Sequence, residues 1–261
     1  MEKNFLKVGD KILFKPSMDG LEYELEGGKV YNVKYSRFNG DISFEPAKMF
    51  TLPNKIYSTA KDDAFIEKVL TKYKAVDSGV LGVMLSGLKG SGKTVMLKQI
   101  AIKSELPIVL LDREFPEYKF KSLFQGLVNT EVCFVFDEID KNDSDFEMSD
   151  LLQVLDGMNT VGKKLMLFAC NDDKKVSEFL VDRCSRVRYW KRFDKMSEEM
   201  IKQVVKDLII EEAKMDEISD FIYTHFECVS FDNILSFVDE IKSFPDQSLE
   251  ELFNDMNLTK K

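Results

Sequence analysis

A glycine-rich segment of this chain ends in a lysine and a threonine. Residues 87–94 read Gly-Leu-Lys-Gly-Ser-Gly-Lys-Thr, between an apolar run and a helix-type pattern. Glycines let backbone N–H groups turn inward onto phosphate oxygens, and the first turn of the following helix adds the positive end of its dipole. The segment therefore predicts a phosphate-binding loop, in which the Lys93 ammonium bridges the β and γ phosphates and the Thr94 hydroxyl binds Mg²⁺. The residues expected to contact the nucleotide are Gly87, Lys89, Gly90, Ser91, Gly92, Lys93, Thr94 and Val95.

Two adjacent carboxylates follow a second apolar run. Residues 133–140 read CFVFDEID, so Asp137 and Glu138 come directly after the run. At the tip of a parallel strand beside the loop strand, Asp137 would hold the Mg²⁺ shell and Glu138 would polarise the water that attacks the γ-phosphate. Apolar strands also commonly end in solvated acids, but the position after a phosphate loop favours a site. Glu138 argues against a Ras-like GTPase, and Asp140 is expected to be a capping or surface acid.

A polar amide follows a third apolar run. Asn171 comes directly after Leu-Met-Leu-Phe-Ala-Cys, residues 165–170. At a strand tip it would orient the attacking water, although asparagine also ends strands as a turn former. The order of phosphate loop, acid pair and Asn171 favours the functional interpretation.

Four of the six arginines of the chain gather in one segment. They are Arg183, Arg186, Arg188 and Arg192. The planar, permanently charged guanidinium suits the charge that develops on a transferring phosphoryl group. The alternatives are a surface basic cluster, or a nucleic-acid patch in which Tyr189 and Trp190 are interleaved.

The elements that must position these residues alternate between helix and strand. Apolar strands are expected at 80–85, 108–112, 132–136, 165–170 and near 186–190, and helices at about 61–74, 93–104, 118–128, 147–157 and 174–182. Strands that are apolar throughout and separated by helices predict an α/β fold with a parallel sheet covered on both faces.

The two ends of the chain differ from this middle. Residues 1–55 alternate short β-type runs with turn signals such as Asn39-Gly40, which favours a small antiparallel β-rich module. Residues 194–261 lack glycine and carry amphipathic patterns, one of them with Ser197 as N-cap, which predict a small all-α lid. The nucleotide-binding domain is accordingly placed at 56–193.

Composition excludes several classes of protein. The 261 residues are 44% hydrophobic and 32% charged, which is ordinary for a globular protein. The net charge is −9, and residues 195–261 hold 16 acidic against 7 basic side chains, so coating of DNA through bulk charge is disfavoured. The single histidine, His225, argues against a His-based zinc site. No apolar run approaches the ~18 residues of a membrane span and no signal-peptide pattern begins the chain, so we expect a cytoplasmic protein without membrane contact.

Together these motifs resemble the AAA+ ATPases. GLKGSGKT is similar to the Walker A motif of that family, CFVFDEID to its Walker B motif, and LLQVLDGMN (151–159) to the Leu-Asp-Gly helix of the AAA branch proper. Asn171 falls at the sensor-1 position. Arg183 and Arg186 stand three residues apart, like the paired arginine fingers of the family, although Arg-Cys-Ser-Arg also resembles the Ser-Arg-Cys of clamp loaders.

The resemblance implies an ATPase that binds ATP and Mg²⁺ and assembles into a homo-oligomeric ring, usually a hexamer. Arg183 and Arg186 would then reach the γ-phosphate held by the adjacent subunit. No arginine follows Arg192, so the sensor-2 arginine of many branches is absent, as in the AAA branch proper. The aromatic pore loop of protein-threading members would fall where only Phe115 or Tyr118 can serve.

We therefore expect an AAA+ ATPase that couples ATP hydrolysis to remodelling of a protein partner or complex. The alternatives are a clamp- or helicase-loader-like ATPase of DNA replication and a scaffold that uses ATP only to switch its assembly. The acidic charge disfavours a nucleic-acid partner without excluding one, and the sequence does not name the target.

Overall fold

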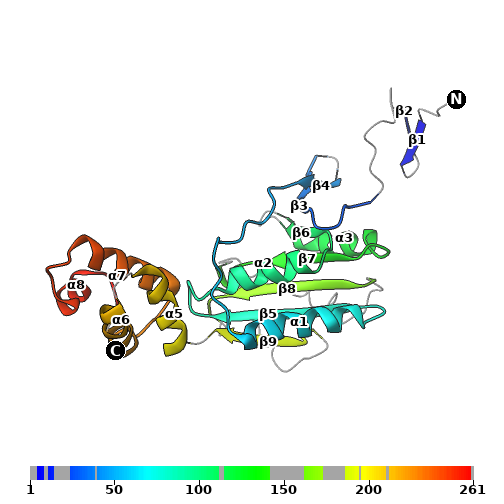
Figure 1. Ribbon diagram of the computed structural model, residues 1–261. Helices are drawn as coiled ribbons and strands as arrows, with labels where there is room; N and C mark the ends of the chain where they lie inside the picture. The colour runs from blue at the N-terminus through cyan, green and yellow to red at the C-terminus, as the bar shows by residue number, and fades with distance from the viewer. Residues whose placement is uncertain are drawn as a thin grey trace.

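The computed structural model describes residues 5–8, 11–14, 24–38, 40–111, 115–141, 162–172, 186–193, 195–209 and 212–259. An α/β core lies beside a group of C-terminal helices (Figure 1). Within the described residues, no helix is long and apolar enough to cross a membrane.

Among the described residues, seven strands form one sheet in the order β4-β3-β6-β7-β8-β5-β9. They are β3 (Val30–Tyr35), β4 (Ile42–Pro46), β5 (Val80–Gly87), β6 (Ile108–Leu111), β7 (Val132–Phe136), β8 (Lys164–Cys170) and β9 (Tyr189–Phe193). All neighbours pair in parallel except β3 and β4. The phosphate-loop strand β5 lies next to β8, so the tips of β5, β7 and β8 meet at one edge of the sheet.

The central strands are mostly apolar because helices cover both of their faces. Every residue of β7 and β8 is buried. Helices α1 (Ala60–Lys74) and α2 (Lys93–Lys103) pack on one face, against side chains such as Leu85 and Leu167. Helix α3 (Phe120–Gly126), preceded by the short helix η1 (Glu117–Lys119), packs on the other face, where Phe124 contacts Phe134.

Part of the expected N-terminal module belongs to this sheet. Strands β3 and β4 pair as an antiparallel hairpin, and Gly40 between them has φ +76°. However, β3 also pairs in parallel with β6, from Val30 opposite Ile108 to Val33 opposite Leu111. The hairpin therefore extends the core sheet at its edge rather than standing in a separate domain. Strands β1 (Phe5–Val8) and β2 (Lys11–Phe14) form their own antiparallel pair.

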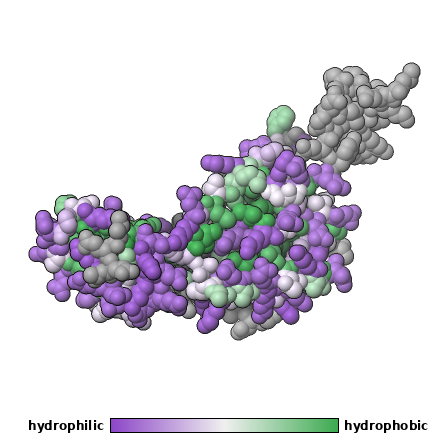
Figure 2. Space-filling model, in the orientation of Figure 1, coloured by the Kyte–Doolittle hydropathy of each residue, from purple (hydrophilic) through white to green (hydrophobic). Residues whose placement is uncertain are grey.

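The described C-terminal residues, 195–209 and 212–259, are helical. They form α5 (Glu198–Leu208), α6 (Glu212–His225), α7 (Phe231–Ser243) and α8 (Leu249–Asp255) around a separate apolar core that includes Ile201, Phe226 and Phe237. The Ser197 hydroxyl accepts a hydrogen bond from the Met200 N–H, as expected of an N-cap. In the view of Figure 2 the surface of these helices is mostly hydrophilic, in keeping with their acidic composition. We call this group the lid.

Several sequence expectations fall outside the described residues. These are the helices at 147–157 and 174–182, the Leu-Asp-Gly segment at 151–159, and Arg183. The amphipathic pattern that begins after Ser197 is split between two helices, α5 and α6. The sequence did not predict α8 as a separate helix.

Candidate functional site

The glycine-rich loop connects β5 directly to α2. Gly87, Gly90 and Gly92 have φ values of +131°, +73° and +96°, a region that side-chain-bearing residues rarely adopt. A Cβ on Gly87 would lie 2.1 Å from the Phe193 carbonyl oxygen, so the loop runs close against the end of β9. All three positions favour glycine because of their backbone conformation, and Gly87 is required in addition by its close approach to Phe193.

The loop opens onto a cavity of about 600 Å³ between the core and the lid. Its walls include residues 89–96, the acid pair Asp137 and Glu138, and Asn171. Seven of the eight residues expected to contact the nucleotide line this cavity. The eighth, Gly87, contributes through its carbonyl oxygen, which accepts a hydrogen bond from the Lys93 Nζ at 2.8 Å. The three motifs are therefore brought to one place by the parallel order of their strands.

Lys93 is a buried cation at the floor of this cavity. Its side chain is buried, and its Nζ donates to the carbonyl oxygens of Gly87 (2.8 Å) and Leu88 (2.6 Å). Burial lowers the pKa of the ammonium, opposed by the nearby Cys170, Asp137, Asp140 and Glu138. An ammonium held by backbone carbonyls and desolvated at the floor of a pocket is suited to receive phosphate oxygens.

The expected magnesium ligands are in contact with each other. The Thr94 hydroxyl donates a hydrogen bond to Asp137 Oδ2 at 3.1 Å. Mg²⁺ prefers oxygen ligands and is usually held by one or two protein groups together with substrate phosphates. The Thr94 hydroxyl and the Asp137 carboxylate lie together beside the phosphate loop, so they fit the ligand set of such an ion. Within the described residues, no group of three or more His, Cys, Asp or Glu side chains forms a metal site by itself.

Glu138 is held in an unusual backbone conformation. Its φ is +56°, one of two positive values among the described non-glycine residues. A left-handed glutamate costs conformational energy, and such strain concentrates at functional sites. The turn it makes leads into the short helix η2 (Ile139–Lys141), where Asp140 Oδ1 accepts a hydrogen bond from the Asn171 backbone N–H at 2.9 Å. Asp140, expected to be a capping or surface acid, thus connects two candidate site segments.

The linker before α1 and the lid complete the cavity, and the sequence did not reveal either contribution. Tyr57 stacks on Phe231 of α7, with ring centroids 5.7 Å apart. Burial and a hydrogen bond to Asp207 raise the pKa of Tyr57 to about 12. Lys55 forms an ion pair with the same Asp207. The Phe231 N–H donates to the Gly90 carbonyl oxygen at 3.1 Å, so the lid contacts the phosphate loop itself.

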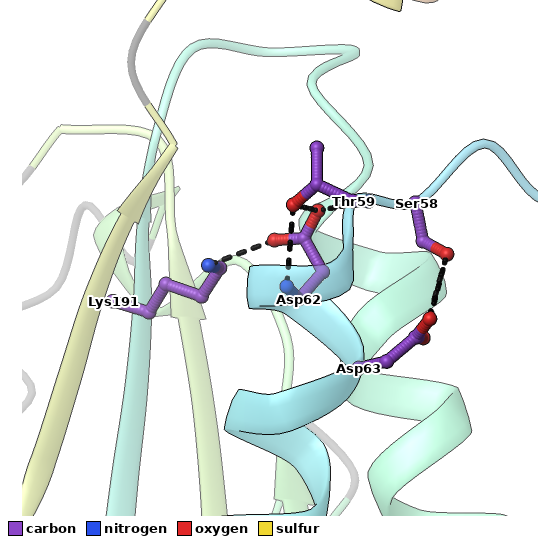
Figure 3. Close-up of polar contacts among 5 residues, drawn as sticks. All are labelled: Ser58, Thr59, Asp62, Asp63 and Lys191. Atoms are coloured by element: carbon purple, nitrogen blue, oxygen red, sulfur yellow. Dashed lines mark hydrogen bonds and ion pairs between the residues drawn. The ribbon is translucent and has the colours of Figure 1, made fainter.

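A capping box fixes the start of α1 at the cavity wall (Figure 3). The Thr59 hydroxyl accepts from the Asp62 N–H at 3.2 Å, and Asp62 Oδ2 accepts from the Thr59 N–H at 2.8 Å. Lys191 of β9 forms an ion pair of 2.8 Å with Asp62. Burial acts to raise the pKa of Asp62, but the hydrogen bonds from Lys191 and Thr59 outweigh it and the pKa is lowered. This network joins the linker, α1 and β9.

Of the three arginines of the cluster that the structure describes, one lines the cavity and two do not. Arg186 is buried, and the neighbouring Arg188 N–H donates to the Gly82 carbonyl oxygen, near the start of β5 and away from the loop at its end. Arg192 lines the cavity. The aromatic residues between them are engaged in packing: the Trp190 Nε1 donates to Ser86 Oγ at 2.8 Å, and Tyr189 packs edge-on against Phe65.

The two aromatic residues considered for a pore loop, Phe115 and Tyr118, differ in their exposure to solvent. Phe115 is buried among the aromatic side chains of the core, whereas the Tyr118 side chain is 66% exposed. Tyr118 packs edge-on against Tyr35 of the β3–β4 hairpin, and Lys119 lies over both rings.

The family comparison agrees with this geometry. Residues 83–192 match the model of the AAA family, the ATPase family associated with various cellular activities. The chain contains an AAA ATPase domain. The matched region includes the loop, the acid pair and Asn171, and it confirms the family resemblance drawn from the motifs. No curated protein matches the chain.

Solved AAA domains share the fold. The crystal structure of the FIGL-1 AAA domain in complex with ADP matches with a TM-score of 0.53 and 17% identity, covering 80% of this chain and 82% of that one. A structure described as the basis for katanin self-assembly matches with a TM-score of 0.51 and 16% identity, covering 75% and 72%. The expected α/β core with a helical lid is thereby confirmed.

Proposed function

We propose that this AAA domain hydrolyses ATP with Mg²⁺ in a ring-shaped oligomer and uses the energy to remodel a protein partner. The observation that carries the proposal is the single cavity into which the phosphate loop, Asp137, Glu138 and Asn171 all open. Such an arrangement places phosphate-binding, metal-binding and water-activating groups around one γ-phosphate.

In this proposal each group has a distinct task. The loop N–H groups and Lys93 bind the phosphates, and Thr94 and Asp137 would hold the Mg²⁺, which neutralises charge on the β and γ phosphates. Glu138 accepts the proton of the attacking water, and the Asn171 amide orients that water. The left-handed backbone of Glu138, between β7 and η2, would let the two adjacent carboxylates serve these separate tasks.

The proposed role of Arg183 and Arg186 requires a neighbouring subunit. Arg186 sits near the start of β5, whereas its own phosphate loop follows the end of that strand. It therefore serves a neighbour's nucleotide rather than its own, and its buried side chain must turn outward when that neighbour binds. The relative described in terms of self-assembly supports an oligomer for this chain.

A protein partner is favoured over DNA. This chain shares its fold with the FIGL-1 AAA domain and with the structure described as the basis for katanin self-assembly. The sequence alternative of a nucleic-acid patch required Tyr189 and Trp190 to be available for stacking, but both pack within the fold. The acidic lid weighs in the same direction.

ATP hydrolysis and nucleotide binding by two matched pairs of variants test the proposal. We expect Glu138→Gln to bind ATP but to lose at least about 100-fold in kcat, since a positioned base contributes roughly 10²–10⁴-fold. The same substitution at Glu131, at the other end of β7, should leave hydrolysis unchanged. Lys93→Ala should lose nucleotide binding, whereas Lys103→Ala, at the far end of α2, should retain it. Full hydrolysis by Glu138→Gln, or tight nucleotide binding by Lys93→Ala, would refute the assignment.

A further inference from the structure

Asp140 forms a bridge between the tips of two strands. The parallel ladder between β7 and β8 runs to the pair Phe136 and Phe168. Beyond that pair the strands lead into the acid pair on one side and Asn171 on the other. The hydrogen bond from the Asn171 N–H to Asp140 Oδ1, 2.9 Å long, joins the two segments across 31 residues of sequence.

The short helix η2 is fixed in a way that aims Asp140 at β8. Glu138, immediately before η2, has a left-handed backbone conformation (φ +56°). Ile139 then packs against the apolar core on the α3 side of the sheet, together with residues such as Phe136 and Phe168. With Ile139 packed against the core and Glu138 at the cavity wall, the position of Asp140 is constrained by the two residues that precede it.

We propose that Asp140 is a positioning residue that keeps Asn171 in register with Glu138. The amide that senses the γ-phosphate and the carboxylate that accepts the proton of water come from different strands, so their separation depends on a connection between the strand tips. Asp140 supplies that connection through a backbone hydrogen bond and contacts no substrate atom itself. The inference rests on the proposed function of Asn171 and Glu138.

Two properties of the Asp140 carboxylate are separable by substitution. It accepts the Asn171 hydrogen bond, and its negative charge also acts on Lys93. Asp140→Asn keeps an acceptor oxygen of the same reach and removes the charge. Asp140→Ala removes both. If the hydrogen bond is what matters, asparagine will substitute for aspartate and alanine will not.

The first experiment measures binding only, in the Glu138→Gln background, so that no hydrolysis is required. Dissociation constants for ATP-Mg²⁺ and ADP-Mg²⁺ are compared among the parent, Asp140→Ala and Asp140→Asn. Losing a partner that orients a site residue commonly costs roughly 10- to 100-fold. We expect Asp140→Ala to reduce the preference for ATP over ADP by about 10-fold while ADP affinity stays within about twofold. Asp140→Asn should keep the preference within about threefold.

Hydrogen exchange of the Asn171 amide gives a second readout that does not depend on nucleotide. Its protection should fall in Asp140→Ala and persist in Asp140→Asn. An unchanged ATP preference in Asp140→Ala would overturn the inference, as would equal losses in both variants, which would point to charge. Equal losses of ATP and ADP affinity would overturn it too, by showing general damage to the pocket. Failure of the proposed function would give a different result: the wild-type protein would bind ATP but would not hydrolyse it.

Discussion

At the level of single residues, the phosphate loop depends on backbone conformations that few residues can adopt. Gly87 combines φ +131° with a close approach to the carbonyl oxygen of Phe193. Lys93 and Thr94 then take their places because the loop leads directly into α2. Sequence analysis found these residues because the spacing of glycines, lysine and threonine carries its own physical explanation.

Gly87→Ala should damage both folding and nucleotide binding. The added Cβ would lie 2.1 Å from the Phe193 oxygen, and the left-handed conformation adds strain of about 1–3 kcal/mol. Gly126→Ala is the matched control, because nothing lies within 4 Å of its Cβ position at the end of α3. That variant should be neutral or stabilised by about 0.4–1 kcal/mol. Urea unfolding and nucleotide titration of both variants decide the matter, and equal behaviour of the two would contradict this account of the loop.

Lys164 makes stability depend on pH. This lysine at the start of β8 is fully buried, and its Nζ donates to the Leu127 carbonyl oxygen at 2.9 Å. Burial lowers its pKa to about 8, opposed by Glu131. Between pH 8 and the ordinary lysine pKa near 10.4, the unfolded chain binds more protons than the folded one, so this group makes the free energy of unfolding rise with pH.

Lys164→Met should remove that contribution. We expect the difference in unfolding free energy between wild type and variant to change between pH 7.5 and pH 9.5, with the wild type gaining relative to the variant. Urea unfolding at the two pH values measures it. A constant difference across this range would show that the folded-state pKa of Lys164 is not lowered.

At the level of elements, the sequence predicted where the strands and helices of the core lie along the chain. It predicted less well which strands pair with one another. Apart from Ser86 and Lys164, the strands β5, β7 and β8 carry no polar side chains, as expected of strands buried on both faces. From Tyr31 onward, strand β3 alternates buried and less buried residues, and this local pattern does not distinguish a strand of the large sheet from a strand of a separate module. Its pairing with β6 depends on contacts distant in sequence.

The contacts of Tyr57 and Phe231 were beyond prediction for the same reason. An aromatic residue in a linker and another at a helix start carry no motif, and their stacking arises only when the lid folds over the loop. The contact between Asp140 and Asn171 was not predicted, because the partner of the Asp140 carboxylate is a backbone N–H rather than a side chain. Backbone contacts of this kind leave no signal in residue types.

The capping box of α1 gives a test at this scale. Thr59→Ala removes the acceptor for the Asp62 N–H and should lower the free energy of unfolding by about 1 kcal/mol. Thr59→Ser retains the hydroxyl and should cost only a few tenths of that amount. Thermal or urea unfolding of the two variants checks the difference, and equal destabilisation would mean that the lost methyl group, not the cap, is responsible.

At the level of the whole molecule, the cavity lies where core, linker and lid meet. The Phe231 N–H donates a hydrogen bond to the Gly90 carbonyl oxygen, so the lid contacts the phosphate loop directly. Lys55 forms an ion pair with Asp207 of α5, which joins the linker to the lid. Arg186 lies away from its own loop, near the start of β5. These two observations support the proposed oligomeric ATPase, in which each subunit would contribute arginine to the nucleotide site of its neighbour.

The most direct test is the mass in solution of the Glu138→Gln protein with and without ATP-Mg²⁺, measured by light scattering. Because this variant should hold ATP without hydrolysing it, the account predicts a shift from small species to a ring, with a hexamer of 30.1-kDa subunits as the expected size. Glu131→Gln, which should turn ATP over, is the matched control and should hold the ring only transiently. A Glu138→Gln protein that binds ATP and stays monomeric at high concentration would contradict the account.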